Sequence, residues 1–147
     1  MRTLSPVLLV ACLSAAAAAH AVEFRSVGAE PAVLYDAPTA KGRKVFIAPS
    51  GMPVEIVLTY GDWTKIRDAS GTLAWIQSRT LIPKRNVIVE AQKARVRSAA
   101  DEGAPVVFTA ERGVLLELTE PVGGGWLRVR HADGAAGYVP AGEVWGE

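Results

Sequence analysis

An internal repeat constrains the fold of this chain more than any other feature of its sequence. Residues 61–76 read GDWTKIRDASGTLAWI, and residues 123–139 read GGGWLRVRHADGAAGYV. Shifted by 62 positions, the chain matches itself from Ala32 onwards, and one extra glycine before Trp126 changes the shift to 63. Self-similarity at a fixed period indicates a duplicated structural unit. We predict two tandem units of roughly 55–60 residues, near the lower limit at which a core can hold a domain unaided.

Each unit has the pattern of β-strands rather than of helices. WTKIR in the first copy and WLRVR in the second alternate strictly, so every second side chain points to the same face. DASG and HADG follow as turns, with Gly71 and Gly134 supplying a positive φ. The return strands carry a small residue, Ala74 or Gly137, which allows another backbone to approach closely. The pattern predicts an all-β chain made of two small five-stranded barrels.

The repeated segments resemble the distal half of bacterial SH3-like domains. The pattern of that family is G-x-W-x-[KR]-[VI]-[RD], a turn that ends in Gly, then a small residue, an aromatic residue and Ile or Val. GDWTKIRDASGTLAWI and GGWLRVRHADGAAGYVP both follow this pattern. PSGMPVEIVLTYGDWTKIRDASG is similar in particular to the tandem extracytoplasmic subfamily of bacterial SH3 (SH3b) domains. The resemblance covers about residues 30–82 and 92–145 and implies two SH3-like barrels.

What the resemblance implies about function is a binding role. Members of the wider family are often found on cell-envelope proteins, are non-catalytic in their barrels, and bind cell-wall peptides, glycan-linked peptide or protein partners. We therefore expect a first SH3-like domain at 22–82, a connector at 83–91 and a second SH3-like domain at 92–147. The partner is expected to be peptidoglycan or its peptide stems, and the alternative is another envelope protein for which the chain acts as an interaction or scaffolding subunit.

The first 21 residues are typical of an export signal. A positively charged start precedes an apolar segment, LSPVLLVACLSAAAAA, and the Ala-His-Ala at 19–21 is a small-x-small cleavage site. We expect cleavage between Ala21 and Val22 and a periplasmic or secreted mature protein. A second interpretation is a lipoprotein, because LVAC matches the bacterial lipoprotein box and would place a lipid on Cys12.

Composition excludes several classes of partner and of chemistry. Cys12 is the only cysteine, so the mature chain has neither a disulfide framework nor a thiol nucleophile. Removing residues 1–21 takes Arg2 from the 16 basic residues and leaves all 15 acidic ones, so the formal net charge becomes zero. A neutral chain with interspersed charges is not expected to bind nucleic acid or an anionic membrane surface. No segment of the mature chain reaches membrane-spanning length.

The candidate binding residues are the aromatic and cationic side chains on the outward faces of the repeated strands. An indole supplies contact area at low entropic cost, and a neighbouring cation can meet a carboxylate. The alternative for the two repeated tryptophans is packing over the barrel rim or at the seam between the copies. The candidates are Tyr35, Trp63, Lys65, Arg67 and Trp75 in the first copy and Trp126, Arg128, Arg130 and Tyr138 in the second.

A groove for proline-rich helices, which eukaryotic SH3 relatives possess, is incomplete in both copies. The first copy has Tyr35, but Gln77 stands where the closing proline belongs. The second copy has Pro140, but its ARVRSAA segment lacks the tyrosines, and Glu143 stands where a closing tyrosine belongs. Polyproline binding is therefore not expected of either domain.

No constellation of residues points to an enzyme or to a cofactor. His131, the only histidine of the mature chain, and Asp133 fall in a tight turn, where both residue types are common. One histidine is too few for a zinc site or for a Ser-His-Asp triad. The Asp101-Glu102 pair lies in a Gly- and Ala-rich loop with nothing to raise a carboxyl pKa. We expect a non-catalytic chain without cofactor or metal.

Overall fold

The computed structural model describes residues 21–147, and the side chains of all of these except 121 and 122. Cys12 and the predicted signal peptide, apart from its last residue, lie outside the described residues. Ala21 and Val22, the predicted cleavage site, are exposed and directly precede the first strand. The described residues form fourteen β-strands and two single 3₁₀ turns. The prediction of an all-β chain is confirmed.

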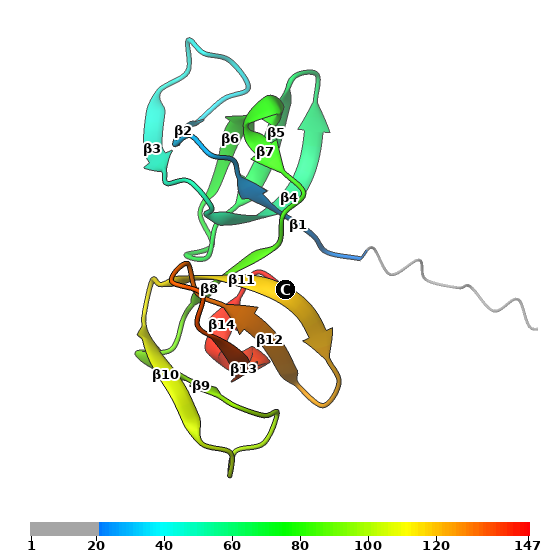
Figure 1. The fold of residues 1–147 in the computed structure, drawn as a ribbon. Helices are drawn as coiled ribbons and strands as arrows, with labels where there is room; N and C mark the ends of the chain where they lie inside the picture. The colour runs from blue at the N-terminus through cyan, green and yellow to red at the C-terminus, as the bar shows by residue number, and fades with distance from the viewer. Residues whose placement is uncertain (1–20) are drawn as a thin grey trace, which may run out of the picture.

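The first domain is an antiparallel sheet in the order β3-β2-β6-β5-β4-β1-β7 (Figure 1). Its elements are β1 (Glu23–Val27), β2 (Ala32–Tyr35), β3 (Lys44–Ala48), β4 (Pro53–Tyr60), β5 (Trp63–Arg67), β6 (Leu73–Gln77), the 3₁₀ turn η1 (Ser78–Thr80) and β7 (Leu81–Ile82).

The second domain repeats this topology in the order β10-β9-β13-β12-β11-β8-β14. Its elements are β8 (Asn86–Val89), β9 (Lys93–Arg97), β10 (Val106–Glu111), β11 (Leu115–Val122), β12 (Trp126–Arg130), β13 (Ala136–Pro140), the 3₁₀ turn η2 (Ala141–Glu143) and β14 (Val144–Trp145). The duplication predicted from the repeat is therefore a duplication of the whole sheet.

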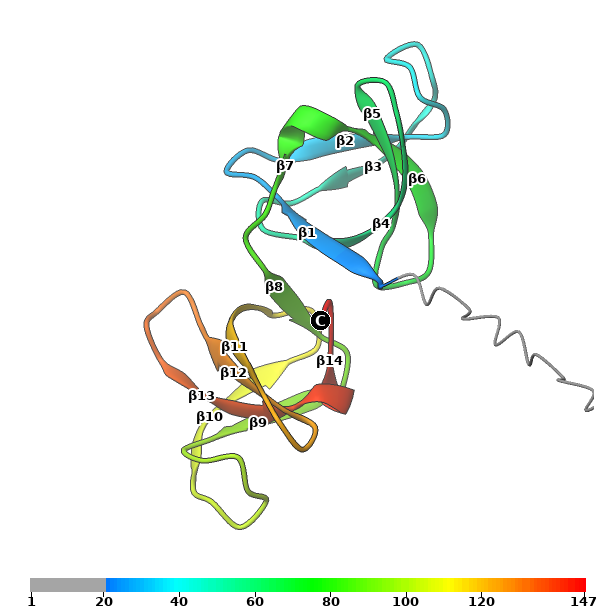
Figure 2. The same ribbon diagram turned by 90° about the vertical axis from the view of Figure 1, so that its right-hand side faces the viewer.

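Each sheet has seven strands rather than the five expected. The two added in each domain are the entry strand, β1 or β8, and the short exit strand, β7 or β14, which pair with each other. β8 lies inside the segment 83–91, which the sequence suggested as a connector, and hydrogen-bonds to β11 and β14 (Figure 2). The stretch outside both sheets is consequently 83–85.

Strand alternation places a separate apolar core in each domain. In β5 the buried residues are Thr64 and Ile66, and in β12 they are Leu127 and Val129, so the tryptophan that opens each strand faces outward. The turns that follow are also equivalent, with φ of 87° at Gly71 and 93° at Gly134. The positive φ predicted at both glycines is confirmed.

The two domains touch through side chains from the ends of their sheets. Phe24 of β1 meets Trp145 of β14 edge to face, with ring centroids 5.1 Å apart. The Arg85 guanidinium lies 5.5 Å from the Phe24 ring centroid and donates to the Gly146 carbonyl at 3.0 Å. Asn86 donates its side-chain amide to the Gly51 carbonyl at 2.9 Å. These contacts join β1 and the Gly51 turn of the first domain to the start of β8 and to the C-terminal end of the second domain.

Candidate functional site

An open groove of about 510 Å³ lies beside Trp63 in the first domain. Three segments form its walls: the loop between β2 and β3, the tip of the β4–β5 hairpin, and η1. The lining residues are Pro38, Thr39, Ala40, Thr59, Gly61, Asp62, Trp63, Gln77, Ser78 and Arg79. We call this feature the first-domain groove.

Local hydrogen bonds fix the walls of the first-domain groove. Gly61, with φ of 56°, turns the β4–β5 hairpin so that Trp63 begins the next strand beside η1. The Ser78 amide donates to the Asp62 carbonyl at 2.8 Å, and the Ser78 hydroxyl lies 2.7 Å from that of buried Thr64. The hairpin and η1 are therefore tied together directly under the groove.

Four of the predicted residues of the first domain form one continuous surface. Tyr35 and Trp63 meet edge to face, with centroids 5.3 Å apart and an interplanar angle of 88°. Trp75 lies opposite both Tyr35 and Lys65 in the sheet register, and the Lys65 ammonium is 6.0 Å from its ring centroid. All four side chains are half-buried. Arg67 does not belong to this surface, because its Nη1 donates to both carboxylate oxygens of Glu55, at 2.8 and 2.9 Å.

The corresponding residues of the second domain do not form such a surface. Trp126 lies opposite Pro140, and the position of Tyr35 is taken by Arg97, which lies opposite Tyr138. Trp126 takes part in none of the aromatic pairs found within residues 21–147. Arg128 pairs with Glu120 at 3.7 Å. The aromatic surface beside the first-domain groove is therefore a property of the first domain alone.

The remaining candidate, Arg130, belongs to a cross-strand ion pair. It donates to Glu117 Oε2 at 2.9 Å, and Lys84 lies 3.8 Å from the same oxygen. The hydrogen bond from Arg130 is the largest cause that lowers the pKa of Glu117; burial opposes it, and the charge of Lys84 adds to the lowering. Arg130 and Arg67 occupy equivalent positions, and each forms an ion pair with a glutamate of the neighbouring strand.

Sequence reasoning missed a second concave surface, which lies in the second domain. Lys93, Arg95 and Arg97 alternate along β9 and point to one side, while Ala94 and Val96 between them are buried. The three cations line an open trough of about 420 Å³ together with Glu102, Pro140 and Glu143. We call this feature the cationic trough. Its signal in the sequence is the KARVR segment, in which every second residue is a cation.

The His131–Asp133 pair forms a turn. The His131 amide donates to the Ala135 carbonyl at 2.8 Å, and the Ala135 amide donates to Asp133 Oδ1 at 2.8 Å. That amide, followed by a hydrogen bond from His131, lowers the pKa of Asp133. Within the described part of the chain, no three His, Cys, Asp or Glu side chains come together in a group that could hold a metal ion.

Two repeated antiparallel sheets of this topology, each with its tryptophan at the start of the fifth strand, define a tandem SH3-like protein. The model of the bacterial SH3 domain family matches residues 28–83 and 90–146, and the chain belongs to that family. The resemblance inferred from the repeat is thereby confirmed. Proteins of this family are generally binding modules. Among residues 21–147 we find no helix with the length and apolar character that crossing a membrane requires.

Solved structures similar to this chain include NlpC2 and NlpC1 from Trichomonas vaginalis and an NlpC/P60 family protein from Bacillus cereus ATCC 10987. Their sequence identities are 11%, 14% and 14%, with TM-scores of 0.40, 0.40 and 0.38. The alignments cover 86%, 97% and 84% of this chain but 49%, 52% and 56% of those structures. The chain thus spans about half the length of the solved structures it matches. No curated protein matches its sequence.

Proposed function

We propose that this protein is an extracytoplasmic, non-catalytic binding module of the cell envelope, and that its first-domain groove binds peptidoglycan through the peptide stems. The observation that carries the proposal is the continuous surface of Trp63, Tyr35, Trp75 and Lys65 beside an open groove. Half-buried aromatic rings held by a rigid sheet provide contact area without loss of side-chain freedom, which is typical of binding hot spots.

The polar residues of the first-domain groove suit a short anionic peptide better than a proline-rich one. Gln77 offers an amide donor and acceptor where a polyproline groove requires an apolar residue. Arg79 is exposed at the rim and is oriented by a 2.9 Å hydrogen bond to the Gln77 side chain. Peptide stems carry free carboxylates, which Arg79 and Lys65 can meet at the two sides of Trp63.

Sedimentation with insoluble cell wall tests this proposal. We expect the purified protein to co-sediment with peptidoglycan, and Trp63→Ala to reduce the bound fraction at least tenfold, because truncating a central aromatic residue typically costs about 2 kcal/mol or more. Trp126→Ala is the matched control: it removes the same ring from the equivalent position, which lacks an aromatic partner, and should leave binding within about twofold. Retention of the Trp63→Ala variant on the wall at the level of the unaltered protein would contradict the proposed surface.

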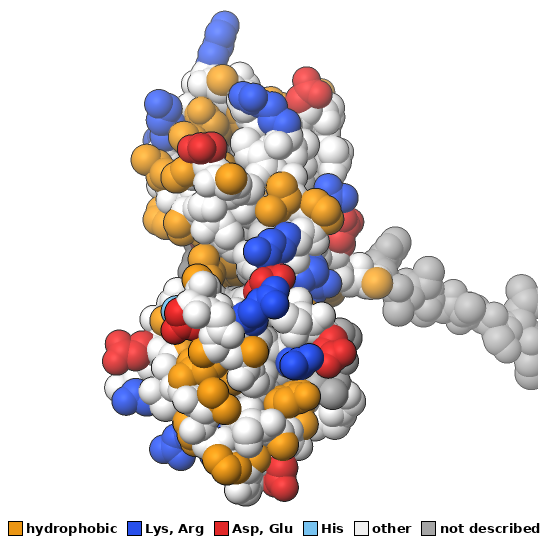
Figure 3. Space-filling view, in the orientation of Figure 1, with side chains coloured by type: hydrophobic (Ala, Val, Ile, Leu, Met, Phe, Trp, Pro, Cys, Tyr) orange, Lys and Arg blue, Asp and Glu red, His pale blue; other side chains and the backbone are white. Residues whose placement is uncertain are grey.

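A second candidate function, docking to another envelope protein, is favoured by a different surface. β3 is the edge strand of the first sheet, and three consecutive side chains on it are exposed: Val45 at 43%, Phe46 at 52% and Ile47 at 65%. Figure 3 shows hydrophobic side chains gathered on the β3 side of the first domain. An exposed apolar edge strand is a template for strand addition by a partner.

The two candidate functions separate in one experiment. Ile47→Lys places a charge on the edge strand and should abolish a complex isolated from periplasm without changing wall sedimentation. Trp63→Ala should do the reverse. Loss of the isolated complex on Ile47→Lys, with no sedimentation of the unaltered protein, would assign the docking function instead.

A further inference from the structure

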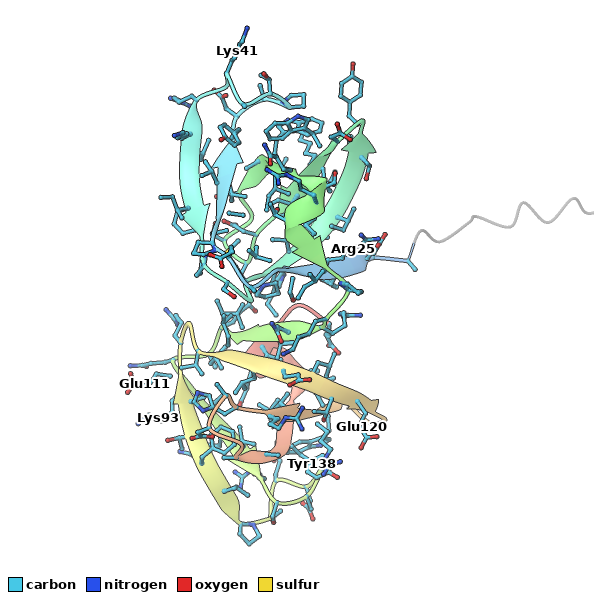
Figure 4. The ribbon with its side chains drawn as sticks, turned by 45° about the horizontal axis from the view of Figure 1, so that its top comes forward. Arg25, Lys41, Lys93, Glu111, Glu120 and Tyr138 are labelled. Atoms are coloured by element: carbon cyan, nitrogen blue, oxygen red, sulfur yellow. The ribbon has the colours of Figure 1, made fainter. Side chains whose placement is uncertain are left out.

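The three cations of the cationic trough outnumber the two carboxylates, Glu102 and Glu143, that line it with them. None of these cations belongs to the ion pairs found among the described residues. This holds even for Lys93, which lies opposite Glu111 in the β9–β10 register (Figure 4). Of the three, only Arg97 has a hydrogen-bond acceptor among the described residues, the Ala104 carbonyl, 2.8 Å from its Nη1. Like charges in line on one face repel each other, so an anion that lies against this row reduces the repulsion.

The spacing of the row matches an extended peptide. Alternate residues of a β-strand are about 6.6–6.8 Å apart, so Lys93, Arg95 and Arg97 present three positive charges at that interval. A second peptide in extended conformation has the same repeat. If it carries an acidic side chain at every second position and lies along β9, each carboxylate faces one cation.

Glu143 makes the cationic trough a better site for a peptide than for a bare polyanion. Its Oε2 atom is shielded from solvent and has no hydrogen-bond partner in the part of the chain that the structure describes, and the residue lines the trough. The Glu143 carboxylate takes part in none of the side-chain hydrogen bonds or ion pairs found among residues 21–147, so it gives the trough an acceptor that the protein leaves unused. A peptide supplies N–H donors together with its carboxylates, whereas a phosphate chain supplies only acceptors and repels this carboxylate.

The first domain shows that the row is not a consequence of the fold. At the shift of 62, the positions of Lys93, Arg95 and Arg97 correspond to Pro31, Val33 and Tyr35. None of these side chains is cationic, although β2 and β9 have the same place in their sheets. The cations of β9 are therefore a specific feature of the second domain.

We propose that the cationic trough binds an extended acidic peptide with carboxylates at alternate positions. This site is separate from the first-domain groove and involves neither Trp63 nor a cell-wall ligand. The chain then holds two different peptide sites, an aromatic one in the first domain and an ionic one in the second.

Titration of the isotope-labelled protein with the blocked hexapeptide Glu-Ser-Glu-Ser-Glu-Ser, followed by NMR, tests the site. We expect shift changes at β9 and η2, weaker at high salt because exposed charges are screened. Lys93→Glu combined with Arg95→Glu should weaken binding at least tenfold. Lys41→Glu combined with Lys44→Glu makes the same charge change on exposed residues of the first domain and should alter binding less than twofold. Equal losses in the two double variants, or no binding by the unaltered protein, would overturn the proposal.

Two further variants separate the possible outcomes. Glu143→Ala should weaken binding of the hexapeptide, because the Glu143 acceptor is lost. It should strengthen binding of inorganic tripolyphosphate, because a negative charge is removed. If the hexapeptide also binds more tightly, the trough is a general anion site and the peptide assignment is wrong. Trp63→Ala should leave hexapeptide binding unchanged, so failure of the wall-binding proposal and failure of this one are distinguishable. Melting curves of each variant establish that it is folded.

Discussion

The two domains share a scaffold but differ on their outward surfaces. Their buried positions keep the same character: Ile66 corresponds to Val129, and Leu34 to Val96, all at most 1% exposed. The outward residue of β2 that lies opposite β6 is Tyr35, whereas the equivalent residue of β9, opposite β13, is Arg97. A core position is constrained by close packing around it, whereas an outward position is constrained only by what it binds. The duplication has therefore preserved the sheet while the two surfaces diverged.

The largest expected effect concerns a close approach that exists in the second domain only. A Cβ added to Gly137 would lie 2.5 Å from the Arg97 carbonyl oxygen and 2.8 Å from Val96 Cγ1, whereas the equivalent Ala74 fits in the first domain. Because the obstacle is backbone, we expect Gly137→Ala to lower the free energy of unfolding by about 3 kcal/mol. Hydrogen exchange should locate the loss at β13 and β9.

Ala74→Gly is the matched control in the first domain. It removes a methyl group and adds backbone freedom, and should cost roughly 0.5–1 kcal/mol. If Gly137→Ala is as mild as Ala74→Gly, β9 and β13 are not held as closely as the structure places them, and the position of Arg97 in the cationic trough is in doubt.

A second pair of variants should affect the domains equally. Gly71 and Gly134 have nearly the same positive φ, and nothing lies within 4 Å of a Cβ built on either. Gly71→Val and Gly134→Val should therefore each lower the free energy of unfolding by about 2 kcal/mol through backbone strain alone. Chemical denaturation of both variants measures this. A neutral result for one of them would show that the two turns are not equivalent.

What the sequence predicted correctly is what the two copies share. The turn glycines, the buried alternation of WTKIR and WLRVR, and the small residue of the return strand recur at a constant shift, so comparing the chain with itself reveals them. The entry strands did not emerge in this way, because EFRSV and NVIV share little beyond Val27 and Val89. They become strands through long-range pairing with β4 and β11, which local pattern does not encode.

The candidate site was predictable only in part for the same reason. Tyr35, Trp63 and Trp75 were identified by residue type, but the commitment of Arg67 to Glu55 depends on the register between β4 and β5. The cationic trough was missed because it lies where the copies differ. A search for repetition passes over such positions, although divergence on a conserved scaffold is where a second function is expected.

The contact between the domains should contribute less than either core. Phe24 and Trp145 come from opposite ends of the described chain and form one edge-to-face pair across the interface. A double-mutant cycle with Phe24→Leu and Trp145→Leu should give a coupling free energy of about 1 kcal/mol. A coupling near zero would mean that the two rings do not stabilise each other and that other contacts, among them those of Arg85 and Asn86, hold the domains together.

The smallest effect is electrostatic and again separates the domains. The Glu55–Arg67 pair has two members, whereas Glu117 meets both Arg130 and Lys84, and Lys84 comes from the stretch between the sheets. Because the folded pKa of Glu117 is lowered, its contribution to stability is present above the ordinary Glu pKa of about 4.3 and is lost as pH falls through the lowered value.

Carbon-detected NMR titration of the Glu117 carboxyl measures this directly. Arg130→Gln should raise the titration midpoint more than Lys84→Gln, because the Arg130 hydrogen bond is the largest cause of the shift and Lys84 is farther from the carboxylate. In Glu117→Gln the melting temperature should fall less steeply in acid than in the unaltered protein. The change should be small, since both partners of the pair are partly exposed to solvent and screened by it. A larger shift from Lys84→Gln would mean that the inter-sheet stretch, rather than the repeated strand pair, governs this carboxylate.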